Sequence, residues 1–139
     1  MALDSGAVDH VLASEHLPSS AEISEVTGNR RGKTFVAANG QPMRTFGEVI
    51  IECDDGQRKS AASYAVTEVS RALQSVSKIC DQDLEILFTK TEAKVRDPKT
   101  GKWIATYPRR GGLYTRTVKA RAGRKPTARP KTSPFTRPR

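Results

Sequence analysis

The chain has 139 residues, of which 24 are basic and 15 are acidic, so its formal net charge is +9. At this length we expect one domain with its own hydrophobic core. The charge is unevenly distributed: residues 116–139 contain nine Lys or Arg and no Asp or Glu, and residues 1–115 contain 15 of each sign. A strongly basic character therefore belongs to the C-terminal segment alone, and the body is expected to be an electrically balanced globular domain.

Several classes of protein are excluded by composition. No apolar run reaches the roughly 20 residues that a membrane-spanning helix needs, and the first residues lack the basic and apolar regions of a signal peptide. The two cysteines, Cys53 and Cys80, are too few for a disulfide framework and suit a reducing compartment. We therefore expect a cytoplasmic protein, with the nucleus as the alternative, and no membrane partner. Neither the cysteines nor the two histidines have metal-ligand spacing, so we expect no metal and no cofactor.

The first half of the body reads as β-structure. Strands are predicted at residues 34–37, 41–46, 48–53 and 60–66, and the Asn39-Gly40 pair between the first two favours a tight hairpin turn. The run over 48–53 is rich in β-branched residues and roughly alternating, which is typical of a half-buried strand. Apolar residues spaced by three and four over residues 69–79 then predict one short amphipathic helix.

The second half of the body continues the pattern. Strands are predicted at residues 84–88, 93–95, 103–107 and 112–114, with a proline- and glycine-containing turn at 97–101. One short helix among several short strands predicts a mainly β fold, either a small barrel or a sandwich. Residues 1–115 form the expected domain, and residues 116–139 form a basic, proline-rich tail.

The tail is expected to be disordered, because it has too little apolar surface to offset the entropy of ordering. Its basic side chains would suit non-specific binding to nucleic acid, which releases counterions from the phosphates whatever the base sequence. Phe135 is its only aromatic residue, which limits base stacking. The alternative is a solvated linker with no partner.

Candidate chemistry lies in residues 3–7, Leu3-Asp4-Ser5-Gly6-Ala7. An apolar residue followed by Asp-Ser-Gly-Ala would place a carboxylate on a sharp turn at the end of a strand. Gly6 would let the backbone reverse closely, and the Ser5 hydroxyl could fix the turn through a backbone hydrogen bond. Asp-Ser-Gly is also a common turn sequence, so an ordinary loop is the competing interpretation.

The order of several segments resembles a known family, the retropepsin-like aspartic proteases, and specifically the protease region of copia-type LTR retrotransposon polyproteins. The resemblance covers nearly all of residues 3–114. It rests on residues 3–7 with a histidine soon after, residues 38–41, a glycine ahead of an apolar strand, and residues 73–81, 87–90, 97–102 and 109–114.

The resemblance implies a small retropepsin-like barrel and a homodimer in which each subunit contributes one aspartate, here Asp4. The two carboxylates would share a proton, one activating water and the other polarising the scissile carbonyl. Ser5 would brace the loop across the dimer, Gly6 would permit close approach, and Ala7 would pack beneath. The substrate would be an extended peptide in a polyprotein, and any activity would be expected at acidic to mildly acidic pH.

Further parts of the expected site follow from the same resemblance. A flap is implied around residues 38–47, including Asn39, Gly40 and Gly47. Residues 73–75 would pack behind the catalytic loop, although the family more often has an apolar residue where Gln74 stands.

The sequence departs from the family at both ends. Residues 1–3 are all that precedes Asp4, where copia-type sequences have a longer apolar run, and the basic tail replaces a zinc-binding region. An excised or degenerate polyprotein fragment is therefore expected. A catalytically inactive binding or dimerisation module, with its tail on nucleic acid, is the alternative function.

Other side-chain groupings favour structural roles. Ser5, Asp9 and His10 lie too close in sequence to form a nucleophilic triad, and His10 and His16 are expected to be solvated or capping residues. Asp81, Asp83 and Glu85 are expected to form a solvated acidic edge. At least one of Trp103 and Tyr107 is expected in the core, and Cys53 and Cys80 are expected to be small buried residues.

Overall fold

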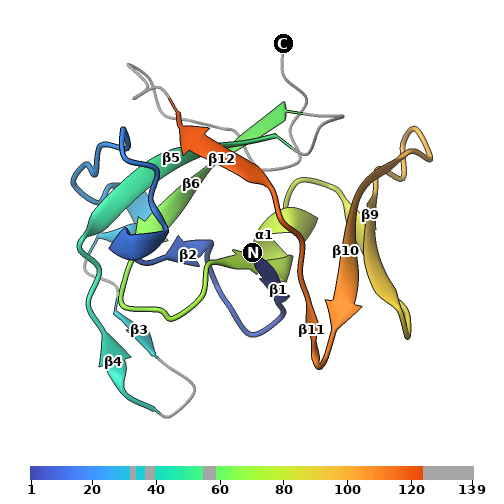
Figure 1. Cartoon of the computed structure of the whole chain (residues 1–139), viewed down its shortest axis with the longest axis horizontal. Coiled ribbons are helices and arrows are strands. Elements are labelled where there is room, and N and C mark those ends of the chain that lie inside the picture. Colours follow the sequence, from blue (N-terminus) through green and yellow to red (C-terminus); the bar gives the residue numbers. More distant parts are fainter. Residues whose placement is uncertain (32–33, 37–39, 55–58, 124–139) are drawn as a thin grey trace.

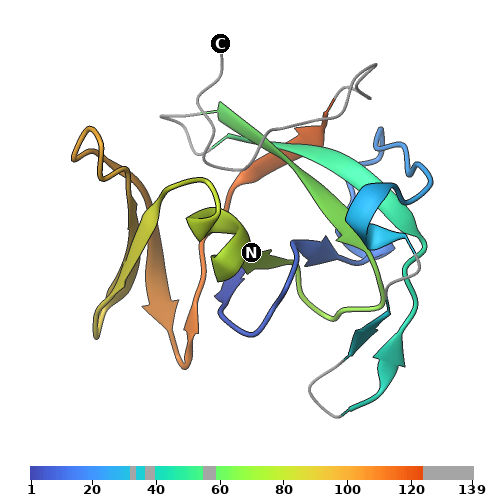
Figure 2. The ribbon, with the colours of Figure 1, turned by 180° about the vertical axis from the view of Figure 1, so that it is seen from behind.

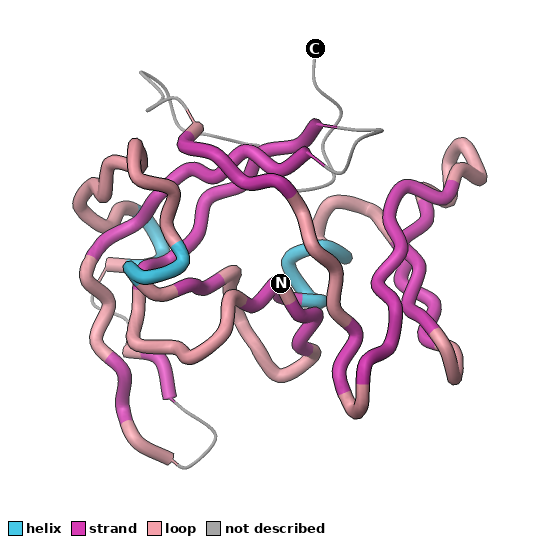
Figure 3. The backbone as a smooth tube through the Cα atoms, viewed as in Figure 1, coloured by secondary structure: helices cyan, strands magenta, loops and turns pink. Residues whose placement is uncertain are grey.

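A computed structural model describes residues 1–31, 34–36, 40–54 and 59–123, and in these residues the fold is mainly β with one short α-helix (Figures 1 and 3). The elements in chain order are β1 (Ala2–Asp4), β2 (Val11–Leu12), the 3-10 turns η1 (Ser14–His16) and η2 (Gly28–Arg30), β3 (Phe35–Val36), β4 (Pro42–Met43), β5 (Gly47–Asp54), β6 (Lys59–Val66), β7 (Leu73–Ser75), α1 (Val76–Cys80), β8 (Glu85–Phe88), β9 (Glu92–Arg96), β10 (Trp103–Arg110), β11 (Leu113–Tyr114) and β12 (Lys119–Ala122).

The largest sheet has six strands in the order β1-β7-β2-β6-β5-β12 and curls into a half barrel. Its centre is the β5–β6 hairpin, which pairs antiparallel from Gly47 opposite Val66 to Asp54 opposite Lys59. Every second residue of β5 is buried, as expected for a strand with one face on the core. The alternation in residues 48–53 therefore predicted both the strand and its buried face.

A second sheet, ordered β11-β10-β9-β8, is antiparallel and stands beside the first, with α1 between them (Figures 1 and 2). The two sheets meet where Ala2 forms an isolated bridge with Thr115. On the inner face of the second sheet, Tyr107 and Val95 are fully buried against Leu3 of β1 and Ile79 of α1. This packing fixes β1, and therefore the start of the Asp4 loop, against two separate layers.

The helix predicted over residues 69–79 is wrong in its first part. Residues 73–75 form β7 instead, and only Val76–Cys80 is helical. The reason is tertiary: β7 pairs in parallel with β1, so its backbone groups are satisfied by a sheet partner rather than by a helix. Ser75 then begins the helix as its N-cap, its hydroxyl accepting a hydrogen bond from the Lys78 backbone N–H.

The boundary predicted at residue 115 is also wrong. Residues 119–122 form β12, which pairs antiparallel with β5, and the Gly123 N–H donates to the Ile50 carbonyl at 2.8 Å. The cause is the edge of β5, whose backbone groups need a partner that composition alone does not reveal. The rest of the expected tail, residues 124–139 with Phe135, lies outside the described residues.

The predicted flap region forms a short two-stranded hairpin, β3–β4. Gly40 has a φ of +84°, which suits a turn position, and Asn39 lies outside the described residues. Gly47 is not part of this hairpin: it begins β5 and is buried, and a Cβ there would lie 2.5 Å from the Ser24 carbonyl oxygen. The flap assignment of Gly47 is therefore wrong, because this glycine permits close packing within the main sheet.

Tyr107 is fully buried whereas Trp103 is 50% exposed, which confirms a core position for one of the two aromatic residues. Cys53 is buried as expected, but Cys80 is exposed at the end of α1. Asp81 and Asp83 lie in the turn after the helix and not on a strand with Glu85. Within the described part of the chain, no helix is long and apolar enough to cross a membrane.

Candidate functional site

Asp4 ends β1 and begins a tight loop. Its side chain is half-buried, whereas Ser5 and Gly6 are exposed. The Gly6 N–H donates to Asp4 Oδ1 at 2.8 Å, and the Ala7 N–H donates to the Asp4 carbonyl at 3.3 Å. A Cβ on Gly6 would lie 3.3 Å from Asp4 Oδ1, so glycine lets the turn close around the carboxylate. The loop thus holds one carboxylate in a fixed orientation with one side open to solvent.

Ser75 supports this loop from behind. It lies opposite Asp4 in the parallel β1–β7 register. Its hydroxyl donates to the Ala7 carbonyl at 2.6 Å and accepts from the Lys78 N–H at 3.2 Å. The strand pairing and the hydroxyl together connect the two ends of the Asp4 loop to the start of α1. Residues 73–75 therefore lie directly behind the loop, at the place that the family resemblance implied for them.

His10 is the next contact in this chain of interactions. Its Nδ1 accepts a hydrogen bond from the Ser75 backbone N–H at 3.0 Å, so Nδ1 carries no proton. The side chain is 4% exposed and lies 5.2 Å, centroid to centroid, from the Tyr64 ring. Burial lowers the pKa of His10 to about 4; nearby Asp9 opposes the shift, and Arg30 and Lys78 add to it. The expectation that His10 is solvated or a simple cap is wrong. His16 does act as a cap, its Nδ1 accepting from the Ala13 N–H at 2.9 Å.

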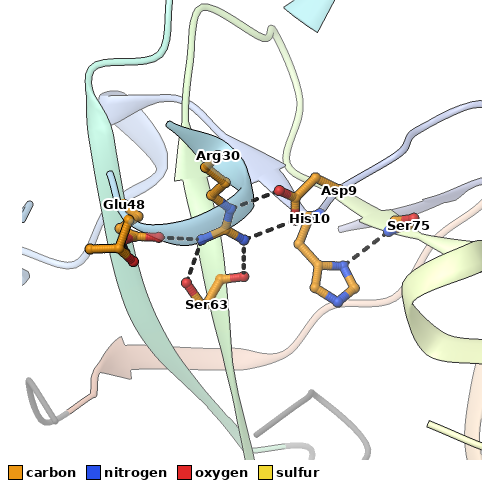
Figure 4. Close-up of polar contacts among 7 residues, drawn as sticks. Asp9, His10, Arg30, Glu48, Ser63 and Ser75 are labelled. Atoms are coloured by element: carbon orange, nitrogen blue, oxygen red, sulfur yellow. Dashed lines mark hydrogen bonds and ion pairs between the residues drawn. The ribbon is translucent and has the colours of Figure 1, made fainter. Parts of the chain in front are cut away.

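A buried cluster centred on Arg30 holds the segment that carries His10 (Figure 4). The guanidinium donates twice to Asp9, to Oδ2 at 2.7 Å and to Oδ1 at 2.8 Å. It also donates to Glu48 Oε2 at 2.8 Å, and to both the hydroxyl and the carbonyl of Ser63. All five guanidinium N–H groups therefore have acceptors.

The electrostatics of the cluster follow from this geometry. Burial alone would raise the pKa of Asp9, but the hydrogen bonds and positive charge of Arg30 hold it below its ordinary value. Burial acts in the opposite sense on Arg30, whose pKa is nevertheless raised by Asp9 and Glu48. The cluster joins the segment before β2 to η2, β5 and β6. It is a structural support for the site and contains no exposed nucleophile.

Gln74 is fully buried between the two sheets. Its side-chain N–H donates to the Tyr64 hydroxyl at 3.1 Å, and the Tyr107 hydroxyl donates to its Oε1. Tyr64 belongs to the core of the six-stranded sheet, and Tyr107 belongs to that of the four-stranded sheet. The amide is thus satisfied on both sides, which explains why a polar residue is tolerated behind the loop.

The β3–β4 hairpin packs against the core beside β2 and β7. Phe35 and Met43 pack against a cluster that includes Val11 and the partly buried Leu73. The hairpin and the Asp4–Asp9 loop project on the same side of the molecule (the lower side in Figures 1 and 2). Val8, in the loop, is 70% exposed, so apolar as well as polar groups of the loop are available for contact.

The structure therefore gathers some of the expected site residues and separates others. Asp4, Ser5, Gly6 and Ala7 form one loop, whereas Gly47 lies in the sheet. The resemblance placed residues 73–75 behind the loop, but sequence reasoning missed the role of Arg30 and the contact between His10 and Ser75, because these partners are distant along the chain. Within the described residues, no group of three or more His, Cys, Asp or Glu side chains is placed to hold a metal ion.

Comparison with known proteins found no relative of the chain. No family model, curated protein or solved structure matches the chain.

Proposed function

We propose that this chain is one subunit of a homodimeric aspartic endopeptidase of the retropepsin type, with Asp4 as the residue that acts on the substrate. The observation that carries the proposal is the Asp4 loop: a half-buried carboxylate at the end of a buried strand, oriented by the Gly6 N–H and open on one side. The parallel strand behind it and the β3–β4 hairpin on the same side of the molecule add support, because a protease of this type needs a rigid loop and a cover for its peptide.

The chemistry requires two copies of the loop. Two carboxylates about 3 Å apart share one proton, because both cannot ionise comfortably at that distance. The ionised carboxylate removes a proton from a bound water, whose oxygen attacks the scissile carbonyl carbon. The protonated partner donates a hydrogen bond to the carbonyl oxygen. Collapse of the tetrahedral intermediate breaks the C–N bond, and the leaving nitrogen takes up the proton that the first carboxylate removed from the water.

The other residues of the loop have supporting roles in this proposal. Ser5 and Gly6 are exposed, so they are available to meet the same loop of a second chain. The β3–β4 hairpin would close over an extended peptide and exclude water. The proposed substrate is a polyprotein of the retrotransposon type, in which case the protease cleaves the polyprotein of which it is itself a part.

The direct test is hydrolysis of a denatured protein substrate by the full chain between pH 3 and 7. The assay compares the unmodified chain with Asp4→Asn and with the control Asp81→Asn, which alters an exposed carboxylate in the turn after α1. The proposal predicts that a statine-type inhibitor and Asp4→Asn each abolish hydrolysis and that Asp81→Asn leaves it intact. Hydrolysis that survives Asp4→Asn, or no hydrolysis at any pH, would contradict the proposal and favour the binding-module alternative.

A further inference from the structure

His10 is connected to the Asp4 loop through Ser75. This residue contacts the loop in two ways, through its register opposite Asp4 and through its hydroxyl on the Ala7 carbonyl. Any shift of the Ser75 backbone would therefore be passed to both ends of a loop only a few residues long.

The position of the Ser75 backbone depends in turn on His10, whose Nδ1 accepts the Ser75 N–H and would stop doing so if the ring were protonated. The lone pair on His10 Nδ1 receives the Ser75 N–H at 3.0 Å in a buried environment. A protonated imidazole would present an N–H to an N–H, which replaces a hydrogen bond with a repulsive contact. The ring has no exposed route to a different partner, because only 4% of His10 is exposed.

The elements packed around the His10 imidazole contribute charged groups and one aromatic ring. Asp9 is adjacent in sequence, Arg30 approaches from η2 and Lys78 from α1, and the Tyr64 ring of β6 packs beside it. Asp9 is already engaged by two hydrogen bonds from Arg30. The negative charge next to His10 is therefore largely compensated, and two cations oppose a third positive charge.

We propose that His10 is a positioning residue for Asp4: its neutral Nδ1 holds Ser75, Ser75 holds the Ala7 end of the loop, and protonation of the ring releases this support. The inference rests on the proposed function for its catalytic consequence. Protonation of His10 would therefore lower activity at acidic pH through a change within each subunit, separately from the titration of the aspartate pair.

Two substitutions separate the role of His10 as a hydrogen-bond acceptor from its protonation. In His10→Asn, the amide Oδ1 occupies nearly the position of Nδ1 and accepts the Ser75 N–H, but it does not titrate. In His10→Leu the acceptor is lost at every pH. We expect His10→Leu to lower kcat by about 10- to 100-fold with little change in KM, since misplacement of a reacting group falls on the chemical step. We expect His10→Asn to restore kcat and to remove the loss of activity near pH 4.

A readout that does not need activity comes from NMR titration of the labelled full chain between pH 7 and 3. The chain has two histidines, so His10→Asn assigns the remaining imidazole signals. We expect the His10 ring and the Ser75 and Gly6 amides to change together, with a midpoint near 4. Amide changes that persist in His10→Asn belong to carboxylates and are subtracted.

The outcomes distinguish the two proposals. Amides that stay unchanged while His10 titrates, or a His10 midpoint near 6.5, would overturn the positioning role even in an active enzyme. A coupled titration in a chain without Asp4-dependent hydrolysis would retain the structural connection and refute the proposed function. If His10→Leu does not fold, the NMR titration and the pH profile of His10→Asn still decide the matter.

Discussion

Substitution of Arg30 by Met is expected to destabilise the fold more than any exposed charge change. The variant keeps much of the aliphatic stem but leaves the carboxylates of Asp9 and Glu48 without the cation that pairs with them, and their side chains are only 9% and 13% exposed. Breaking a buried ion pair by removing one partner costs about 3–5 kcal/mol. Domains of this size unfold at a cost of about 5–15 kcal/mol in total, so the loss is a large part of the whole.

Urea denaturation followed by circular dichroism measures this change. The matched control is Arg121→Met, which removes an arginine from an exposed pair with Glu52, 66% and 35% exposed respectively. The control should cost no more than about 1 kcal/mol. Adding Asp9→Asn to Arg30→Met should recover part of the loss, since one uncompensated charge is then absent. A cost for Arg30→Met no larger than that of the control would refute the assignment of Arg30 as the centre of a buried support.

Three further predictions concern packing, hydrogen bonding and pH. Gly47→Ala should lower the free energy of unfolding by about 1–3 kcal/mol in urea, because the new Cβ would meet the Ser24 carbonyl oxygen at 2.5 Å; an unchanged midpoint would contradict this packing. Tyr107→Phe should cost about 1–3 kcal/mol by removing the donor to buried Gln74 Oε1, and an equal stability would show that this contact is unimportant. Because the pKa of His10 falls from 6.5 to about 4 on folding, the unfolded chain binds more protons between these values. Stability should therefore decline by about 3 kcal/mol as pH falls through this window, and the decline should be absent in His10→Asn.

Much of the fold could be predicted from local pattern. The alternation in residues 48–53 indicated β5 and its buried face, and the Asp97–Gly101 segment indicated a turn that the structure contains, with the Gly101 N–H donating to the Asp97 carbonyl at 2.7 Å. These features depend on neighbours in sequence, which is why composition and spacing were sufficient for them.

The elements that failed are those decided by distant partners. Leu73–Ser75 has apolar spacing compatible with a helix, but pairing with β1 makes it a strand. Lys119–Ala122 lies in a basic segment that resembles a tail, but the open edge of β5 orders it. In both cases a sheet partner more than 60 residues away satisfies the backbone, and no local pattern records it.

The candidate site divides in the same way. The Asp4 loop was recognisable from residues 3–7, and the resemblance placed residues 73–75 behind it, whereas the side-chain contacts that support the loop could not be predicted. The contact between His10 and Ser75 spans 65 residues, and Arg30 meets Asp9 across 21. The sequence carried one sign of this support. Two polar residues, Asp9 and His10, come immediately before the apolar residues that form the buried strand β2.

If Asp4 is half of a site shared by two chains, mixing intact and substituted subunits will lower the activity by a predictable fraction. The unmodified chain and Asp4→Asn are combined in equal amounts, allowed to exchange subunits, and assayed for peptide hydrolysis at a constant total concentration. If only dimers with two intact aspartates are active, random pairing leaves about one quarter of the activity. A mixture with Asp81→Asn should keep full activity. Retention of about half the activity with Asp4→Asn would mean that each chain works alone, which would refute a site shared by two chains.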